Sequence, residues 1–310
     1  MKCGIGLARL LAKGSKHLSL VLVVSLAACK TGTKDPEPFD WQGHRGARGE
    51  APENTLAAMS RALQEGVKTL EMDVVLTKDS VVILSHEPWF NSEICLDAKG
   101  EEWSDSADRN LFHYPYSEIA KCDCGTKKYD RFPSQEHFFA AKPRLIDVLS
   151  EAEEASMMMN RPEPYYNIEI KSRPDWDSVY YPSLESYCEQ VMAILQKANL
   201  GKRLTIQSFD ARTLNYMHKH YPQVQLAYLS EDGDRSPAQQ IKELGFVPNI
   251  YSCDYNLLKA GEVKQLQASG MKVIPWTVNE IEDAKRLREW GVDGIITDYP
   301  ARMLSSIGKF

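Results

Sequence analysis

The chain has 310 residues, of which 43% are hydrophobic and 26% are charged, and its formal net charge is −6. This composition is typical of a globular protein and excludes a disordered or fibrous chain. The acidic balance also argues against nucleic acid as a partner, because binding to a phosphate backbone depends on basic surface.

The first 28 residues have the pattern of a secretory signal. Four basic residues and no acidic residue occur there, and they precede an apolar run at Leu18–Ala28 that is too short to span a bilayer. The run ends in Leu26-Ala27-Ala28-Cys29, which resembles the lipobox of bacterial lipoproteins. This resemblance implies cleavage before Cys29 and lipid attachment to its thiol. The alternative is a plain signal peptide that contains a cysteine.

Residues 29–40 are polar and include two prolines, as expected of a tether between a lipid anchor and a folded domain. We therefore expect a protein that is exported and lipid-anchored to the bacterial cell envelope, on the periplasmic side or at the outer membrane. Several acyl chains together would hold it there stably. Loss of residues 1–28 would take the net charge from −6 to −10.

Residues 41–310 alternate short apolar runs with amphipathic stretches. The expected strands are Trp41–Gly46, Thr69–Leu76, Val81–His86, Tyr165–Lys171, Leu204–Phe209, Gln225–Leu229, Ile250–Asp254, Lys272–Val278 and Gly294–Thr297. Helices are expected between most of them, for example Thr55–Glu65, which stops at Gly66, and Glu280–Trp290, with Asn279 as its cap. Strands that alternate with helices predict a parallel sheet with both faces covered.

The second and third expected strands are joined by only four residues, 77–80, which is too short for a crossover helix. They should therefore pair antiparallel, with Thr77 near Val81 and residue 72 near residue 86. This pair would leave eight parallel strands and one hairpin arm. The segment Pro88–Lys142 has no clean periodicity, and an insertion of this length over the mouth of a barrel is usually functional or flexible.

Five cysteines remain after the signal and Cys29 are set aside, an odd number for an oxidising compartment. A bridge from Cys95 to either Cys122 or Cys124 is one interpretation. Buried free thiols are the other, and the sequence does not choose between them.

The strand Thr69–Leu76 carries the first candidate site residues. Glu71 and Asp73 are two positions apart, so both carboxylates point to one face of the strand. Two like charges on an inward face are costly unless a cation neutralises them, and oxygen ligands of this kind suit Mg²⁺ or Ca²⁺. A pair of solvated carboxylates is the alternative, but the residues from Leu70 to Val75 are otherwise apolar.

Two histidines flank this carboxylate pair. The expected hairpin returns His86 beside Glu71 and Asp73, and His44 ends the first strand at the same mouth, where barrel active sites form. Two histidines beside a carboxylate-bound cation fit acid–base cleavage of a phosphodiester. Arg45 could hold the phosphate through its rigid donor fork.

The strand Tyr165–Lys171 alternates polar and apolar residues, so that Asn167, Glu169 and Lys171 share one face. Glu169 is a candidate third metal ligand and Lys171 a candidate phosphate contact. An interior salt bridge between these two residues is the alternative interpretation.

Eight short motifs occur in order between residues 43 and 300. They are His44-Arg45-Gly46, Pro52-Glu53-Asn54-Thr55, Glu71-Met72-Asp73, Val81 to His86, Ile168-Glu169-Ile170-Lys171, Gln207-Ser208-Phe209, Trp276-Thr277-Val278-Asn279 and Asp293 to Pro300. Together they resemble the glycerophosphodiester phosphodiesterase family. The resemblance implies a (β/α)8 TIM barrel and hydrolysis of a small glycerophosphodiester to glycerol 3-phosphate and an alcohol.

The resemblance also implies roles for single residues. It implies one divalent cation held by three carboxylates, acid–base roles for two histidines, and substrate contacts from three further side chains. These residues are, in that order, Glu71, Asp73 and Glu169; His44 and His86; and Arg45, Lys171 and Trp276. One departure stands out, since the family usually has aspartate after the second histidine and this chain has Glu87.

Two other functions fit the same sequence. One is a phospholipase-type enzyme acting on a lipid-linked phosphodiester, because a lipidated protein would lie beside such a substrate. The other is a non-catalytic binding lipoprotein on the same barrel, which would have no reason to keep both histidines and all three carboxylates. The oligomeric state cannot be read from the sequence.

Overall fold

The computed structural model of the protein describes residues 39–103 and 109–307. The expected signal peptide at 1–28, the lipid-bearing Cys29 and the tether as far as residue 38 lie outside these residues. In the part of the chain that is described, no helix is both long and apolar enough to cross a membrane.

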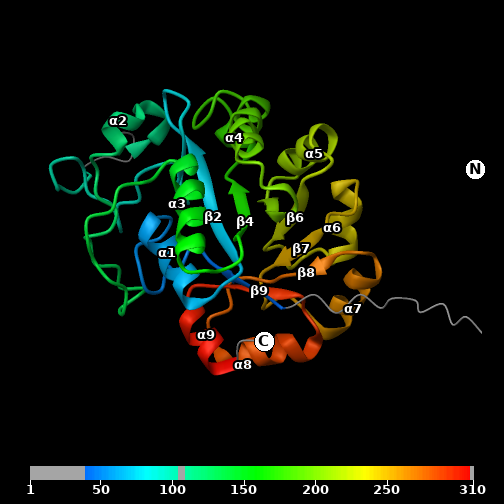
Figure 1. The fold of residues 1–310 in the computed structure, drawn as a ribbon. Helices are drawn as coiled ribbons and strands as arrows, with labels where there is room; N and C mark the ends of the chain where they lie inside the picture. The colour runs from blue at the N-terminus through cyan, green and yellow to red at the C-terminus, as the bar shows by residue number, and fades with distance from the viewer. Residues whose placement is uncertain (1–38, 104–108, 308–310) are drawn as a thin grey trace, which may run out of the picture. The chain divides into compact units, whose positions relative to one another are not determined.

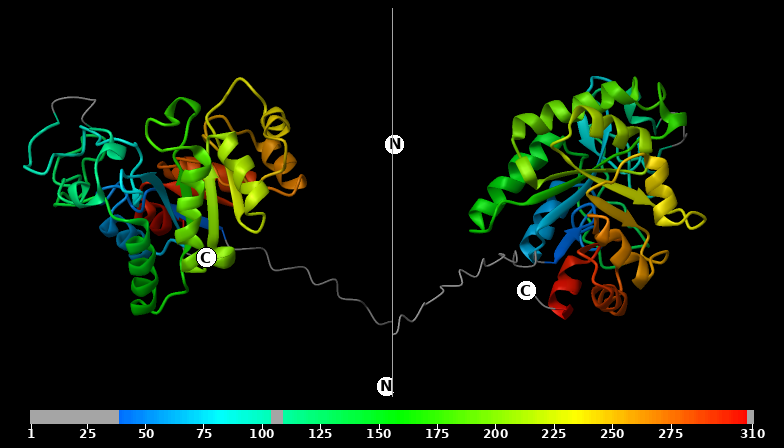
Figure 2. Two further views of the ribbon diagram at one scale, coloured as in Figure 1. Left: turned by 90° about the horizontal axis from the view of Figure 1, so that it is seen from above. Right: turned by 90° about the vertical axis from the view of Figure 1, so that its right-hand side faces the viewer.

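Eight parallel strands form the barrel expected from the sequence, as Figures 1 and 2 show from three sides. They are β1 (Asp40–Gly43), β2 (Thr69–Leu76), β4 (Tyr165–Ile170), β5 (Leu204–Ser208), β6 (Gln225–Ser230), β7 (Ile250–Cys253), β8 (Lys272–Val273) and β9 (Gly294–Thr297). Their order in the sheet is β8-β7-β6-β5-β4-β2-β1-β9. The parallel sheet predicted from the alternation of strands and helices and the (β/α)8 fold implied by the family resemblance are therefore both confirmed.

The barrel closes between its two outermost strands, β8 and β9. Three backbone hydrogen bonds join the chain after Lys272 to β9, from Asp293 N to Val273 O, from Ile296 N to Pro275 O and from Val278 N to Ile296 O. No regular ladder forms there, because Pro275 has no N–H group to donate. The predicted strand Lys272–Val278 is for this reason only two residues long.

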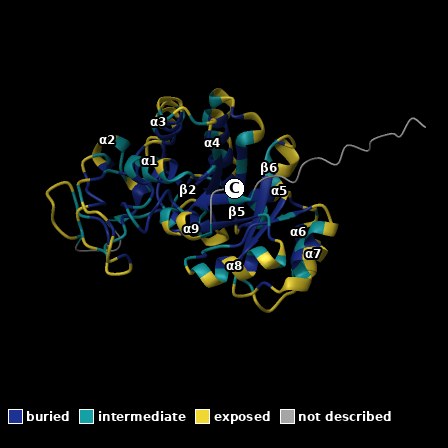
Figure 3. Ribbon diagram, turned by 60° about the horizontal axis from the view of Figure 1, so that its bottom comes forward, coloured by how far each residue is buried: buried dark blue, intermediate teal, exposed yellow. Residues whose placement is uncertain are grey.

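One helix follows each barrel strand. These helices are α1 (Leu56–Glu65), α3 (Leu145–Met158), α4 (Leu184–Ala198), α5 (Ala211–His220), α6 (Pro237–Leu244), α7 (Ala260–Ala268), α8 (Ile281–Trp290) and α9 (Pro300–Ile307). The Thr55 side chain caps α1 by accepting a hydrogen bond from Ala58 N, and Gly66 ends it with a φ of 106°. Figure 3 shows buried strands within the barrel and exposed residues on the outer faces of the helices.

The hairpin arm has the predicted register. Strand β3 (Val82–Leu84) runs antiparallel to the end of β2, with Val74 opposite Leu84 and Leu76 opposite Val82. This register is the one expected from a turn that places Thr77 near Val81, and the Thr77 backbone N–H donates to Val81 O. The strand returns the chain to the mouth of the barrel just before His86.

The insertion at 88–142 lies beside β2, α1 and α3 and has its own small core (Figures 1 and 2). It contains the short helix α2 (Tyr116–Ile119) and a 3-10 turn at Leu111–His113. A disulfide joins Cys95 to Cys124, which selects one of the two bridges left open by the sequence. Cys122 stays a buried free thiol, as do Cys188 and Cys253.

The two faces of β2 differ sharply in chemistry. Leu70, Met72 and Val74 belong to the hydrophobic core between the strands and the helices, whereas Glu71 and Asp73 alternate with them and point into the barrel. Below the mouth, the interior is polar on this side. The Asn167 amide donates to Gln42 and to Gln207, and Gln207 donates to Glu71.

Candidate active site

A pocket of about 660 Å³ opens at the carboxyl-terminal ends of the barrel strands, the end at which barrels of this kind place their reacting groups. Around the barrel, β9, β1, β2 and β4 form one arc of the mouth, and β5 to β8 form the other. The first arc and the hairpin arm carry the candidate histidines, carboxylates and phosphate contacts. The second arc contributes Phe209, Leu229, Glu231 and Trp276 to the pocket.

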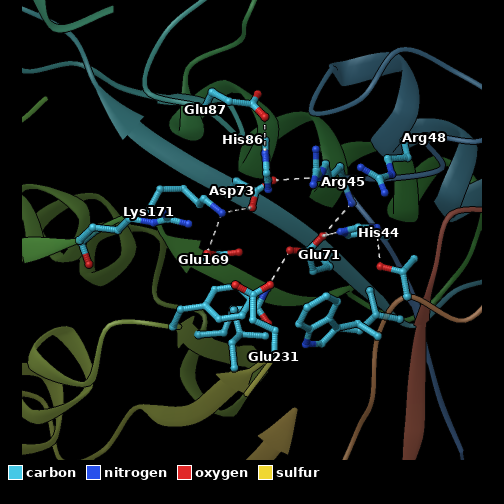
Figure 4. Close-up of a pocket in the computed structure, with 18 of the residues that line it drawn as sticks. His44, Arg45, Arg48, Glu71, Asp73, His86, Glu87, Glu169, Lys171 and Glu231 are labelled. Atoms are coloured by element: carbon cyan, nitrogen blue, oxygen red, sulfur yellow. Dashed lines mark hydrogen bonds and ion pairs between the residues drawn. The ribbon is translucent and has the colours of Figure 1, made fainter. Parts of the chain in front are cut away.

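Three buried carboxylates meet at the centre of the first arc (Figure 4). Glu71 and Asp73 come from β2 and Glu169 from β4, and one oxygen atom from each carboxylate lies within 4.8 Å of the other two. The parallel register places Asp73 opposite Glu169. The structure thus brings together the three residues that the sequence suggested as metal ligands.

The charges of this cluster are poorly balanced by the chain. Burial and the repulsion of Asp73 raise the pKa of Glu71 well above its usual range. Burial raises the pKa of Glu169 to about 7, although Lys171 opposes the shift. Burial also acts to raise the pKa of Asp73, but Arg45 and other cations outweigh it, so that pKa is lowered. A cation with oxygen ligands would relieve this repulsion, so the donor set fits Mg²⁺ or Ca²⁺.

Neighbouring groups hold the two carboxylates of β2 in place. Glu71 accepts hydrogen bonds from the Arg45 backbone N–H and from Gln207 Nε2, both at 2.7 Å. Asp73 accepts one from Asn54 Nδ2 at 2.9 Å, and its own backbone N–H donates to Asn54 Oδ1. These contacts leave the carboxylates little freedom, which favours a preformed site.

The turn after β1 explains the glycine of the His44-Arg45-Gly46 motif. Arg45 has a φ of 50° and Gly46 a φ of 83°, and a Cβ atom at Gly46 would lie 2.4 Å from the backbone carbonyl carbon of Ala58. Only glycine fits this conformation and this close approach. The turn directs the Arg45 backbone N–H at Glu71.

The Arg45 side chain lines the pocket and keeps one donor without a hydrogen-bond partner. It donates to Glu53 through Nη1 at 2.8 Å. Its buried Nε has no hydrogen-bond partner among the described residues and lies 3.4 Å from Asp73 Oδ2. A buried donor of this kind is costly unless a ligand satisfies it.

His44 is held by a carboxylate from the far end of the chain. Its Nδ1 lies 2.6 Å from Asp298 Oδ1, while its Nε2 lies 4.0 Å from Glu71 Oε2. Burial and the neighbouring Arg48 lower the pKa of His44 to about 4, although Asp298 opposes the shift. The fixed Nδ1 contact leaves Nε2 as the nitrogen that faces the carboxylate cluster.

His86 has a matching arrangement on the hairpin arm. Its Nδ1 lies 2.6 Å from Glu87 Oε1, so the glutamate that stands where the family usually has aspartate contacts the ring of His86. The backbone of this segment is fixed by Ser85, whose hydroxyl donates to Glu87 O and accepts from Lys142 Nζ. Figure 4 shows His86 beside Asp73 and His44 beside Glu71.

Lys171 lies between the carboxylate cluster and Phe209 of the second arc. Its Nζ lies 2.9 Å from Glu169 Oε1 and 3.9 Å from Asp73 Oδ1. The interior salt bridge considered from the sequence is therefore present. It does not exclude contact with a phosphate, because Lys171 also lines the pocket.

Trp276, the third substrate contact that the resemblance implied, lies on the second arc. Its Nε1 donates to Ser252 O at 2.9 Å, and its ring packs edge-to-face against Phe209. Trp276 thus lines the same pocket as the charged residues of the first arc, from the opposite set of strands. The opposite rim, formed by Trp89 and Trp176, comes from the insertion and from the loop after β4.

Sequence reasoning missed the residues that support His44. Asp298 was part of a motif but had no role, and Asn279 was expected to cap α8. The cap of α8 is instead Glu280, without a side-chain hydrogen bond. The Asn279 amide binds Asp298, donating to its Oδ2 at 2.7 Å and accepting from its backbone N–H at 2.9 Å. Arg48 Nε donates to the same carboxylate.

We expect Asp298→Asn to lower kcat by about 10- to 100-fold, the usual cost of losing such a supporting contact. Burial alone would raise the pKa of Asp298, but the positive charges of His44 and Arg48 outweigh this effect. The pKa of Asp298 is therefore lowered, and the group is an anion. An amide of the same size cannot stabilise a protonated His44. Steady-state kinetics would measure the loss. An unchanged kcat in a correctly folded variant would show that the contact has no part in the reaction.

Comparison with known proteins agrees with this geometry. A family described as the glycerophosphoryl diester phosphodiesterase family matches residues 44–302. A glycerophosphodiester phosphodiesterase from Caldanaerobacter subterraneus is 29% identical over 269 residues, which cover 86% of this chain and 96% of that protein. One from Bacillus altitudinis is 30% identical and covers 84% of this chain and 94% of its own length.

Similarity extends to a solved structure. A protein from Silicibacter pomeroyi superimposes with a TM-score of 0.78 at 30% identity. The match covers 87% of this chain and 93% of that one.

Proposed function

The chain belongs to the glycerophosphoryl diester phosphodiesterase family and is an enzyme of that class; from this premise we propose that its reaction needs one divalent cation and two histidines. Glu71, Asp73 and Glu169 would hold this cation, and their oxygen ligands suit Mg²⁺ or Ca²⁺. His44 and His86 are the acid–base pair. The substrate is a small glycerophosphodiester, and the products are glycerol 3-phosphate and an alcohol.

The observation that carries this proposal is the pairing of each histidine with a carboxylate on one rim of the pocket. Both Nδ1 atoms lie 2.6 Å from a carboxylate oxygen. Such a contact fixes the ring and stabilises its protonated form during proton transfer. A non-catalytic binding protein would not need two histidines held in this way next to three carboxylates.

The reaction breaks the bond between phosphorus and the oxygen of the alcohol. Arg45 and Lys171 bind the phosphate oxygens, Arg45 through its unsatisfied Nε. When bound, the divalent cation would offset negative charge on the phosphate oxygens. One histidine accepts the proton of the nucleophile, and the other donates a proton to the leaving alcohol. The nucleophile is either water or a neighbouring glycerol hydroxyl, which would give a cyclic phosphate first.

A panel of diesters tests the function. The purified enzyme should release glycerol 3-phosphate from glycerophosphodiesters with choline, ethanolamine, glycerol or inositol as the alcohol, each with Mg²⁺ or Ca²⁺. A lysophospholipid in the same panel separates this function from that of a phospholipase-type enzyme. Activity on the lysophospholipid alone would overturn the assignment of a small soluble substrate, and absence of all hydrolysis would overturn the proposed function.

We also propose that Cys29 anchors the enzyme to the cell envelope, on the strength of its lipobox-like sequence. Cys29→Ala should release the protein from the membrane fraction or leave the precursor unprocessed. Cys3→Ala, which removes a thiol within the signal, is the matched control and should remain in the membrane fraction. Normal processing and full membrane retention of the Cys29 variant would contradict lipidation.

A further inference from the structure

Glu231 differs from the other acidic residues of the pocket. Glu71, Asp73, Glu87 and Glu169 each have a hydrogen-bond or ion-pair partner. Glu231 also lines the pocket, from the loop directly after β6, but it has no such partner in the described part of the chain. Its negative charge is therefore available to a ligand.

Two aromatic rings lie on the same arc of the mouth. Phe209 and Trp276 pack edge-to-face, with ring centroids 5.5 Å apart and an interplanar angle of 82°. Phe209 is 37% exposed, although it is large and apolar. Because the Trp276 N–H is already bound to Ser252 O, the part of the Trp276 ring left to face the pocket is carbon surface. Leu229 adds an aliphatic side chain to this wall.

The position of this wall determines which part of a substrate reaches it. The groups that would hold the phosphate, Arg45 and Lys171, stand on the first arc, and Figure 4 shows Glu231 across the pocket from His86 and Arg45. A phosphodiester carries two substituents on phosphorus. The pocket offers each of them a wall, one lined by Trp89 and Trp176 and the other by Glu231.

We propose that Glu231, Phe209 and Trp276 form a subsite for the ammonium group of the alcohol, as in a choline or ethanolamine ester; this inference rests on the proposed function. Aromatic faces attract a cation through their negative quadrupole, and most strongly when the cation carries methyl groups. A free carboxylate adds a full charge on the same wall. Lys171 Nζ also lies 5.8 Å from the Phe209 ring, but its charge is paired with Glu169.

The sharpest test removes the charge of the substrate without changing its shape. In the 3,3-dimethylbutyl ester of glycerol 3-phosphate, carbon replaces the nitrogen of glycerophosphocholine. The wild-type enzyme should favour glycerophosphocholine over this neutral ester by roughly tenfold in kcat/KM, the scale of a partly exposed cation–aromatic and charge contact. Glu231→Gln should move the ratio toward one by lowering kcat/KM for the choline ester alone, while the aromatic rings keep part of the preference.

Asp234→Asn is the matched control, because it removes one negative charge from an exposed position on the same loop and does not line the pocket. It should keep the wild-type ratio. A ratio that Glu231→Gln leaves unchanged would overturn the proposal. An equal loss on both esters would also overturn it, since Glu231 would then contact the glycerol part that the two substrates share.

A binding measurement separates this inference from the proposed reaction. Tetramethylammonium should bind the wild-type protein in calorimetry, and Glu231→Gln should weaken that binding by roughly tenfold. Binding that depends on Glu231 in a protein without hydrolytic activity would contradict the proposed function and keep the subsite. Hydrolysis of the diesters without any binding that depends on Glu231 would do the reverse.

Discussion

Chelation of divalent cations should abolish hydrolysis of every accepted glycerophosphodiester, and Mg²⁺ or Ca²⁺ should restore it. The reason lies in the three buried carboxylates, each of which offers one oxygen within 4.8 Å of the other two. Without the cation, burial and the charge of Asp73 disfavour the ionisation of Glu71 and Glu169. The positive charge that the cation would add beside the phosphate is then missing. Activity assays after dialysis against EDTA, with and without each added metal, measure the effect.

The ligand variant Asp73→Asn should lose metal binding and activity together, because the side chain keeps its size but not its charge. Asp130→Asn, at an exposed position of the insertion, changes the net charge equally and should retain both. Full turnover after exhaustive chelation would show that the carboxylate cluster serves another purpose.

Metal binding at the carboxylate cluster can also be tested through the stability of the protein, without any substrate. A metal at 100 times its dissociation constant stabilises a folded protein by about 2.7 kcal/mol. The wild-type enzyme should therefore unfold at a higher temperature with Mg²⁺ or Ca²⁺ than with EDTA, and Asp73→Asn should show no such difference. An equal shift in both proteins would place the metal at another site.

Replacement of either histidine should have an effect of similar size. His44→Ala and His86→Ala should each lower kcat by roughly 100-fold or more, the usual contribution of positioned acid–base groups. Neither side chain belongs to the carboxylate cluster, so metal binding should change little. His137→Ala, at an exposed position of the insertion, is the control and should keep wild-type rates.

The leaving group distinguishes the two roles. A nitrophenyl ester barely needs protonation as it leaves, so it should restore activity to the variant that lacks the acid and not to the variant that lacks the base. Pairing with a carboxylate does not assign the roles, because both histidines have such a contact. Near wild-type rates for both variants on a natural diester would contradict the mechanism.

Local sequence patterns predicted the centre of the site because the relevant geometry is local. Alternation along β2 and β4 set the face on which the carboxylates lie, and the four-residue connection before Val81 set the register that returns His86. Each inference needed only the period of a strand or the length of a turn. The alternation of strands and helices predicted a covered parallel sheet in the same way, and the family resemblance implied that this sheet is an eight-stranded barrel.

The rest depended on contacts between distant parts of the chain. Asp298 reaches His44 across 254 positions, and nothing in the sequence near either residue reveals the pair. The sequence predicts Asn279 as the N-cap of α8 because it precedes a helical pattern. In the structure, closure of the barrel places Asn279 against Asp298 instead. The partner of Cys95 also depends on the folded chain. Cys122 and Cys124 are only two residues apart, so the sequence offers no ground for choosing between them.

The division of the mouth into two arcs has a consequence for how this enzyme could diversify. The reacting groups stand on adjacent strands and the arm, and the wall around Glu231 stands on strands that follow them in the chain. Substitutions at Phe209, Leu229, Glu231 and Trp276 can therefore retune the accepted alcohol while the chemistry stays intact. A library confined to these four positions would sample new substrates at little risk of losing the reaction. These positions are therefore the ones to vary first in directed evolution.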